Sequence, residues 1–298
     1  MKSKKTVFKG VGTALITPFL NGEIDYASLA NLIEMQIAGG VSALIIGGTT
    51  GEAATLTDYE RYSLYSFCRE KCAGRIKLIF GTGTNDTRAA VAHTKQASEI
   101  GCDGVLLVTP YYNKGTEEGV FHHYMTLLEA TELPAILYNV PSRTGVNLGI
   151  GLLSRLAEHE NTAGIKEAGD SADRLVALSC FGEALPLYAG NDTQIYTVLS
   201  LGGAGVISVV SNILPKETSE IARLYYEGKK EKSLSLQQAM LPFINTLFLE
   251  TNPSPIKYIM STAELCSPEL RLPLYQPRES TRLATEAEFS KLRSRKEN

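Results

Sequence analysis

The residue with the clearest chemical signature is Lys166, which ends the apolar stretch Ala163-Gly164-Ile165. A charged ammonium is costly inside a buried strand unless it is paired or neutralised. Burial lowers the pKa of a lysine and favours the free amine, which can attack a ketone and form an imine. The alternative is a lysine at a strand end whose ammonium reaches solvent. Schiff-base chemistry is therefore one hypothesis for this position.

Two other side chains could serve such chemistry. Tyr138 closes the preceding apolar run, and a phenol relayed through a threonine hydroxyl can move the protons that imine formation and carbon–carbon bond formation require. Arg143 follows in a turn-rich loop, where a guanidinium suits bidentate carboxylate binding. A tyrosine packed in the core and a solvated arginine are the respective alternatives.

A glycine-rich turn, GTTGE at 48–52, adds two hydroxyls and several backbone N–H groups that can hold a small carboxylate. It precedes a predicted helix with Thr57 as N-cap and Glu60 three residues later. The turn lacks the Gly-Lys-Ser/Thr element of a Walker A loop. No histidine and no carboxylate cluster ends an apolar run, which argues against metal hydrolysis, Ser-His-Asp catalysis and glycosidase chemistry. His122-His123 falls in a predicted helix and is expected at the surface.

These residues follow a regular alternation of apolar runs and amphipathic stretches. Helices are predicted over 26–38, 58–72 and 88–100, between runs that are apolar at successive positions, as in strands buried on both faces. Eight such units favour an α/β fold, a closed (β/α)8 TIM barrel, over a doubly wound open sheet. Eight strands are predicted, at 10–19, 43–48, 77–83, 104–110, 135–141, 162–168, 186–192 and 205–211.

The pattern changes after the eighth run. From about Pro215 it is helical only, so we expect a barrel over residues 1–224 and a C-terminal helical appendix over residues 225–298. In a barrel of this kind the chemistry lies at the carboxyl ends of the strands, which is where Lys166, Tyr138 and the GTTGE turn are found.

The composition of the chain indicates which kinds of binding partner and which cellular compartment to expect. The chain has 298 residues, a net charge of −3 and no basic block beyond a few charges at its two ends, which argues against nucleic acid and anionic membranes. No apolar run is long enough for a transmembrane helix, and the start MKSKKTVFKG lacks the apolar region of a signal peptide. The five cysteines are odd in number and lack zinc-site spacing, so we expect reduced thiols in a cytoplasmic protein.

Together the motifs are specific. The chain resembles the dihydrodipicolinate synthase family, within the N-acetylneuraminate lyase superfamily of class I aldolases, from about Gly10 to Pro277. The matching stretches are GGTTGEAATL (47–56), GTGTND (81–86), VTPYYNKGTEEG (108–119), ILYNVPSRTG (136–145), GIKEAGD (164–170) and LGGAGVISV (201–209).

The resemblance implies a reaction and a set of roles. Pyruvate would form an imine and condense with L-aspartate 4-semialdehyde, feeding lysine and diaminopimelate synthesis, without a cofactor or catalytic metal. The usual assembly is a homotetramer, a dimer of dimers. The implied catalytic residues are Lys166, which forms the imine, and the proton relay of Tyr138, Thr49 and Tyr112, the last from a neighbouring subunit. The implied binding residues are Thr50 for the pyruvate carboxylate, Arg143 for the semialdehyde, and Gly190 and Ile207 along the pyruvate pocket.

Two other readings stay open at this point. One is a pyruvate-dependent aldolase or lyase for N-acetylneuraminate or a 2-keto-3-deoxy sugar acid, although a polyol chain would prefer neutral partners where Arg143 stands. The other is a catalytically silent homologue used for binding, which the presence of all five key side chains disfavours.

The resemblance also bears on regulation by free lysine. The chain keeps Asn85 and Tyr111, which suit the carboxylate of the inhibitor. It has Ala89 where sensitive relatives carry a glutamate, and Asp58 and Arg61 where they usually carry histidines. We therefore expect weak or absent inhibition by L-lysine, because one anionic partner is gone and Arg61 repels a cation.

Overall fold

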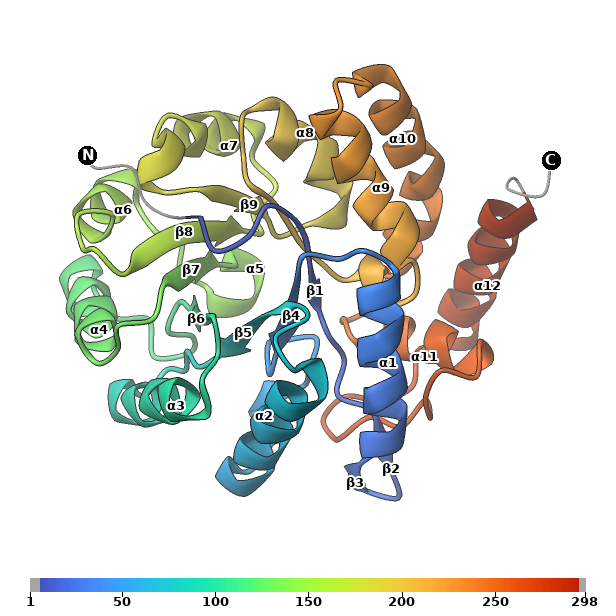
Figure 1. Ribbon diagram of the computed structural model, residues 1–298, viewed down its shortest axis with the longest axis horizontal. Helices are drawn as coiled ribbons and strands as arrows, with labels where there is room; N and C mark the ends of the chain where they lie inside the picture. Colours follow the sequence, from blue (N-terminus) through green and yellow to red (C-terminus); the bar gives the residue numbers. More distant parts are fainter. Residues whose placement is uncertain (1–5, 295–298) are drawn as a thin grey trace.

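The computed structural model describes residues 6–294, in which eight parallel strands close into a barrel (Figure 1). Each predicted apolar run contains one of them, so the (β/α)8 barrel is confirmed and the open sheet is excluded. Around the barrel the strands follow the order β1-β10-β9-β8-β7-β6-β5-β4, and β4 pairs with β1. The strands are β1 Gly10–Ala14, β4 Ala43–Ile46, β5 Lys77–Gly81, β6 Gly104–Val108, β7 Ala135–Asn139, β8 Thr162–Glu167, β9 Leu187–Ala189 and β10 Gly205–Ser208.

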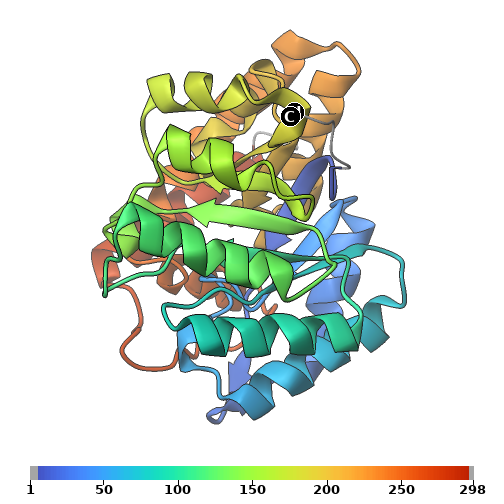
Figure 2. The same cartoon turned by 90° about the vertical axis from the view of Figure 1, so that its left-hand side faces the viewer.

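Helices cover the outside of the barrel, and Figure 2 shows several of them lying alongside the strands. Two predicted helices match to the residue and a third begins one residue earlier than expected. The capping box predicted at Thr57 is present: its hydroxyl accepts from the Glu60 N–H, and the Glu60 carboxylate accepts from the Thr57 N–H. The helices up to the end of the barrel are α1 Tyr26–Ala38, α2 Asp58–Cys72, α3 Thr87–Ile100, α4 Glu117–Glu129, α5 Pro141–Thr144, α6 Ile150–Leu156, α7 Ala172–Ser179, α8 Ile195–Ser200 and α9 Pro215–Tyr226.

The strands separate two apolar layers, because successive side chains point to opposite faces. In β4, Ala43 and Ile45 belong to a small cluster inside the barrel, together with Phe8. Leu44 and Ile46 belong to the larger layer between the barrel and the helices. Both faces are therefore buried, which explains why the runs are apolar at successive positions.

Three further helices follow the barrel: α10 Lys230–Thr246, α11 Ser254–Thr262 and α12 Glu279–Ser294. In Figure 1 they form a group on one side of the molecule, and the rings of Phe243 and Phe289 lie 5.1 Å apart between α10 and α12. The link between α10 and α11 runs over the mouth of the barrel, where it contributes to the cavity described below. None of the helices in the range 6–294 is both long enough and apolar enough to cross a membrane.

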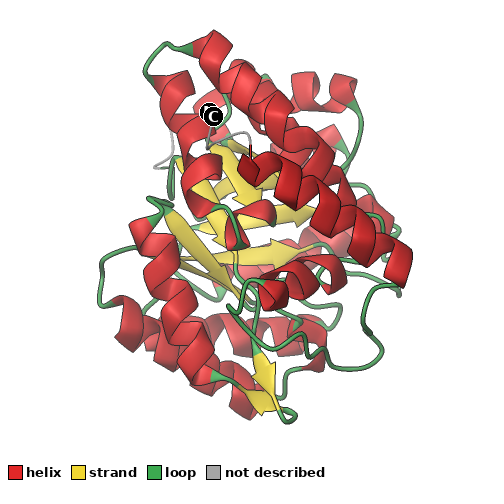
Figure 3. Cartoon of the chain, turned by 90° about the vertical axis from the view of Figure 1, so that its right-hand side faces the viewer, coloured by secondary structure: helices red, strands yellow, loops and turns green. Residues whose placement is uncertain are grey.

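The hairpin after the first barrel strand was not predicted. A short antiparallel hairpin, β2 Phe19–Leu20 with β3 Glu23–Ile24, follows β1 and lies at the lower end of the view in Figure 3. Two-residue strands show no periodicity, so their sequence resembles a loop.

Candidate active site

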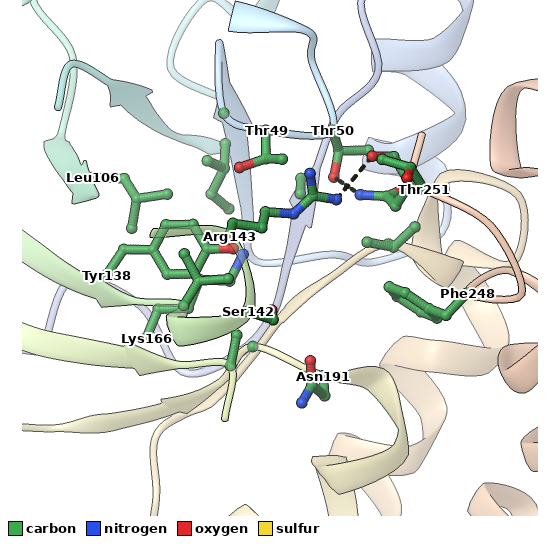
Figure 4. Close-up of a pocket in the computed structure, with 18 of the residues that line it drawn as sticks. Thr49, Thr50, Leu106, Tyr138, Ser142, Arg143, Lys166, Asn191, Phe248 and Thr251 are labelled. Atoms are coloured by element: carbon green, nitrogen blue, oxygen red, sulfur yellow. Dashed lines mark hydrogen bonds between the residues drawn. The ribbon is translucent and has the colours of Figure 1, made fainter. Parts of the chain in front are cut away.

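Tyr138 and Lys166 occupy the same level of two neighbouring strands. Strands β7 and β8 pair in parallel with Tyr138 opposite Lys166, and Ile165 faces the outer layer, so Lys166 turns inward. Its side chain is buried, with 6% of the residue exposed, and Nζ lies 4.2 Å from the centre of the Tyr138 ring (Figure 4). An amine and a phenol are thus held side by side at the carboxyl end of the barrel, where they can act on one bound molecule.

A cavity of about 550 Å³ opens over this pair. It contains the predicted residues Thr49, Thr50, Arg143 and Gly190 as well as the amine and the phenol. A second cavity of about 470 Å³ adjoins it and shares Thr49, Tyr138 and Arg143. Six of the eight residues implied by the resemblance therefore surround one space at the mouth of the barrel.

The GTTGE turn after β4 is held by contacts on several sides. The Thr17 hydroxyl donates to the Gly51 carbonyl at 2.7 Å, which ties the turn to the end of β1. Gly47 has φ +66°, and a Cβ there would lie 2.5 Å from the Tyr65 hydroxyl oxygen, so only glycine fits. Thr50 is buried, with its Oγ1 accepting from Asn252 Nδ2 at 2.9 Å.

Beside the two threonines, Glu52 anchors the turn to the C-terminal part of the chain. It adopts a left-handed φ of 54° and forms a buried ion pair with Lys257. Its other oxygen accepts from the Arg271 backbone N–H at 3.0 Å. Burial lowers the pKa of Lys257, and the nearby Glu52 carboxylate opposes that shift. The ion pair and hydrogen bond hold a strained residue in place at the wall of the second cavity.

Arg143 lies on α5, the single turn after β7, and reaches across the mouth of the barrel (Figure 4). Its Nη2 donates to the backbone carbonyl of Asn252 at 2.9 Å. Asn252 thus contacts both Thr50 and Arg143, and it was not predicted. Its only sequence signal is a polar residue before a proline in a segment interpreted as helical appendix.

On the opposite side, the loop after β9 fixes the end of β10. The Asp192 carboxylate is buried and accepts from the N–H groups of Val209 and Val210, each at 2.9 Å. Burial raises the pKa of Asp192, while its hydrogen bonds and the Lys166 charge oppose the shift. Gly190 precedes it, and a Cβ there would lie 2.5 Å from Ala168 Cβ, so a larger residue would push into the cavity wall.

Comparison with known proteins identifies the family of the chain. The family model for the dihydrodipicolinate synthetase family matches residues 7–292. The chain belongs to the dihydrodipicolinate synthetase family. A 4-hydroxy-tetrahydrodipicolinate synthase of Clostridium novyi is 45% identical over 270 residues, which cover 90% of this chain and 91% of the relative.

Solved structures of the same family share the fold over nearly the whole chain. The crystal structure of dihydrodipicolinate synthase from Thermotoga maritima superimposes with a TM-score of 0.93 and 41% identity, covering 96% of this chain and 99% of that one. A structure described as the first monomeric dihydrodipicolinate synthase variant gives the same TM-score and identity, covering 96% of this chain and 97% of that one. As a member of this family, the chain is a lyase.

Two of the residues implied by the resemblance lie outside the two cavities of the described chain. Tyr112, in the loop after β6, is 89% exposed and lines neither cavity. Ile207, in β10, is fully buried in the small cluster inside the barrel. The single chain therefore brings neither side chain to the cavity wall.

The residues linked to lysine regulation have partners of their own. Arg61 is buried, and its Nη2 donates to the Ala53 carbonyl at 3.0 Å. Asp58 Oδ1 lies 3.0 Å from His93 Nε2, and both residues line the second cavity. The Tyr111 hydroxyl lies within hydrogen-bonding distance of Thr84.

One expectation about histidine was wrong. His123 is buried rather than at the surface, because α4 turns it toward α3, where its Nδ1 lies 2.9 Å from Thr87 Oγ1. Its neighbour His122 is exposed, as expected. Within residues 6–294, no group of three or more histidine, cysteine or acidic side chains is arranged to hold a metal ion.

Proposed function

We propose that Lys166 attacks the ketone of pyruvate and, after loss of water, holds it as an imine that adds to L-aspartate 4-semialdehyde. This condensation to 4-hydroxy-tetrahydrodipicolinate is the reaction of the family to which the chain belongs, and it serves lysine and diaminopimelate biosynthesis. The observation that carries the assignment is the buried Lys166 amine, 4.2 Å from the Tyr138 ring at the carboxyl end of the barrel. A buried amine at a cavity wall is a suitable nucleophile for a ketone.

Proton transfer is assigned to Tyr138, relayed through the Thr49 hydroxyl. Both side chains line the main cavity and the adjoining one, so they face the same bound substrate. Imine formation releases water from a carbinolamine, and this step needs a group that gives and takes a proton. A phenol in contact with the amine meets that need.

The two carboxylates of the reaction are assigned to different sides of the mouth. Thr50 and the backbone N–H groups of its turn would hold the pyruvate carboxylate, with Gly190 leaving room for the bound imine. Arg143 would receive the carboxylate of the semialdehyde, because a guanidinium forms charge-assisted hydrogen bonds with such a group. Ile207 would support the pyruvate pocket from beneath, through the inner cluster of the barrel.

Borohydride trapping tests the nucleophile. Pyruvate plus borohydride should add a stable label to Lys166, detected by peptide mass spectrometry, and Lys166→Ala should lose the label and most of the rate. Lys77→Ala, on an exposed residue of β5, is the matched control and should keep both. A label on Lys77 or Lys114 would show that the assignment is wrong. Rates with aspartate semialdehyde, N-acetylneuraminate and 2-keto-3-deoxygluconate then identify the substrate.

We also propose a cytoplasmic homotetramer, a dimer of dimers, in which Tyr112 completes the proton relay of a neighbouring subunit. The 89% exposure of this tyrosine supports the proposal, because an isolated barrel leaves the side chain in solvent and aromatic side chains are enriched in protein interfaces. Four of the five free cysteines are buried and unpaired, which favours a reducing compartment.

The assembly is tested at the same residue. Tyr112→Phe should preserve the oligomer and lower turnover, whereas Tyr59→Phe, at another highly exposed tyrosine, should leave both unchanged. A structurally similar synthase variant is monomeric, so the oligomeric state has to be measured by analytical ultracentrifugation. Full activity in a demonstrated monomer would contradict the shared relay.

A further inference from the structure

Asn252 lies in the link between α10 and α11 and lines both cavities at the barrel mouth. Only 6% of the residue is exposed. Its Nδ2 donates to Thr50 Oγ1 at 2.9 Å, and its backbone carbonyl accepts from Arg143 Nη2 at 2.9 Å. Its side-chain oxygen, Oδ1, has no hydrogen-bond partner among residues 6–294. A buried acceptor without a partner is uncommon in folded proteins and costs free energy. A hydrogen-bond donor on a bound molecule would therefore bind favourably to this oxygen.

The orientation of this amide matters for the partner it can take. With Nδ2 donating to Thr50 Oγ1, the Thr50 hydroxyl proton stays available for the pyruvate carboxylate. The reverse orientation would use that proton on Oδ1 and leave an N–H beside the pocket instead. The observed arrangement therefore suits both proposed substrates: a donor is kept for pyruvate, and an acceptor is left for the second substrate.

The second substrate carries a matching donor. In an α-amino acid the ammonium and the carboxylate are attached to the same carbon, so the groups that bind them must lie next to each other in the protein. Arg143, the proposed carboxylate partner, is in direct contact with Asn252. An amide oxygen is a suitable acceptor for an ammonium, and hydrogen bonds to charged groups are the stronger ones.

A carboxylate on the same wall is already engaged. Glu250 lines the main cavity, but one of its oxygens accepts from the Arg278 N–H at 2.9 Å and the other lies 3.7 Å from the guanidinium of Arg278. Asn252 Oδ1, in contrast, is a buried acceptor without a donor among residues 6–294.

We propose that Asn252 is a specificity residue for the amino aldehyde: its Oδ1 accepts a hydrogen bond from the α-ammonium of the semialdehyde whose carboxylate is bound by Arg143. The inference rests on the function proposed above and adds the group that recognises the amine. Asn252 thereby selects an aldehyde with an amino-acid end over the same aldehyde without the amino group. Because it contacts both Thr50 and Arg143, Asn252 also fixes the distance between the two proposed binding sites.

Two substitutions separate the two contacts of the side chain. Asn252→Ala removes both, whereas Asn252→Asp keeps an acceptor of the same shape and loses the donor to Thr50, because an ionised carboxylate only accepts. The aldehydes compared are L-aspartate 4-semialdehyde and succinic semialdehyde, which lacks the amino group. Succinic semialdehyde is measured as a substrate or, if it does not turn over, as a competitive inhibitor. Asn191→Asp, which places the same charge on the opposite wall of the cavity, is the matched control.

The expected result is a change in the preference between the aldehydes. Asn252→Ala should lower the preference for the amino aldehyde roughly ten- to a hundredfold, the effect of one hydrogen bond to a charged group. Asn252→Asp should keep or raise that preference while raising the KM for pyruvate. Asn191→Asp should leave the preference unchanged.

Several outcomes would overturn the inference. Equal losses for both aldehydes in Asn252→Ala would assign Asn252 a purely structural role. A gain in Asn191→Asp equal to that in Asn252→Asp would show a general effect of charge rather than a contact. If the alanine variant does not fold, a fall in preference in Asn252→Asp decides against the proposal. Borohydride trapping of pyruvate in the unaltered enzyme is measured separately. An absent label on Lys166 would contradict the proposed function, whereas an unchanged preference between the aldehydes would contradict only the role of Asn252.

Discussion

Tyr138 and Lys166 face each other across a single pair of strands, with the amine over the tyrosine ring. The ring packs against the Lys166 amine, and the phenol oxygen is the group proposed to transfer protons. These two contributions can be separated, because phenylalanine keeps the ring and removes only the hydroxyl.

Replacing Tyr138 by phenylalanine should lower kcat by about a hundredfold or more, the usual contribution of a positioned acid–base group. Pyruvate should still be trapped on Lys166 by borohydride, but more slowly. Stopped-flow or quenched-flow trapping measures that rate. Tyr124→Phe, which removes another buried phenol whose oxygen contacts Thr109, is the control and should retain kcat. An unchanged kcat in Tyr138→Phe would remove the phenol from the mechanism.

Replacing Arg143 by alanine should weaken the second substrate selectively. The loss of one charge-assisted contact costs about 1.5–3 kcal/mol, or roughly ten- to a hundredfold in kcat/KM for the semialdehyde. Imine formation with pyruvate should be spared. Steady-state kinetics and trapping on the same preparation measure both, with Arg155→Ala, at an exposed arginine on α6, as the control. Equal losses in the two assays would point to a structural role for Arg143.

Breaking the buried ion pair between Glu52 and Lys257 should lower the free energy of unfolding, and this is the effect that identifies the pair. Lys257→Met leaves an unpaired carboxylate in the interior, which costs about 3–5 kcal/mol, whereas the double substitution Glu52→Gln with Lys257→Met should recover much of the loss. Urea unfolding of the two single variants and the double variant forms the complete cycle. Additive losses would mean that the two charges do not interact.

His123 gives the protein a pH-dependent stability. Burial lowers the pKa of His123 to about 4, from an ordinary value of 6.5. Because the folded state holds the neutral form, stability is complete above pH 6.5 and falls as the pH decreases toward 4. This residue should account for about 2 kcal/mol of the loss between pH 7.5 and pH 5. His123→Gln should show a shallower dependence in urea unfolding, and His122→Gln should not differ from the parent.

Inhibition by L-lysine should be weak or absent. Ala89 offers no anionic partner, and the Asp58 carboxylate is already beside His93, so it compensates little for the missing charge. Arg61 keeps a permanent cation at the edge of the same cavity. Initial rates at millimolar lysine, with both substrates near half-saturation, provide the measurement. Strong cooperative inhibition below millimolar concentration would contradict this prediction.

Local pattern was sufficient to predict most of the fold. Each of the eight strands is buried on both faces, so its apolar run is visible without any knowledge of its neighbours. Several helices, among them α2, α3 and α4, begin at a side-chain cap, which is also a local signal. The β2–β3 hairpin was missed because its strands are too short to show a period.

The candidate site was predicted on the barrel strands and in the segments that directly follow them, but not in the link between α10 and α11. Lys166 stands out because a charge follows an apolar run. Asn252 shows no such signal, since its partner Thr50 is 202 residues away in the sequence and only the folded chain brings them together. His123 was placed wrongly because a histidine pair in a helix does not show which member faces the neighbouring helix.

The ion pair between Glu52 and Lys257 joins residues 205 positions apart in the sequence, and this separation affects folding during synthesis. A ribosome synthesises the eight barrel strands well before it reaches Lys257, so the nascent chain can form its strands and outer helices while the GTTGE turn still lacks its anchor. We expect the GTTGE turn to become ordered later than the barrel strands, once its anchor is available. When pyruvate is added to stalled nascent chains of increasing length, imine formation on Lys166 should be detected only after α11 has left the exit tunnel.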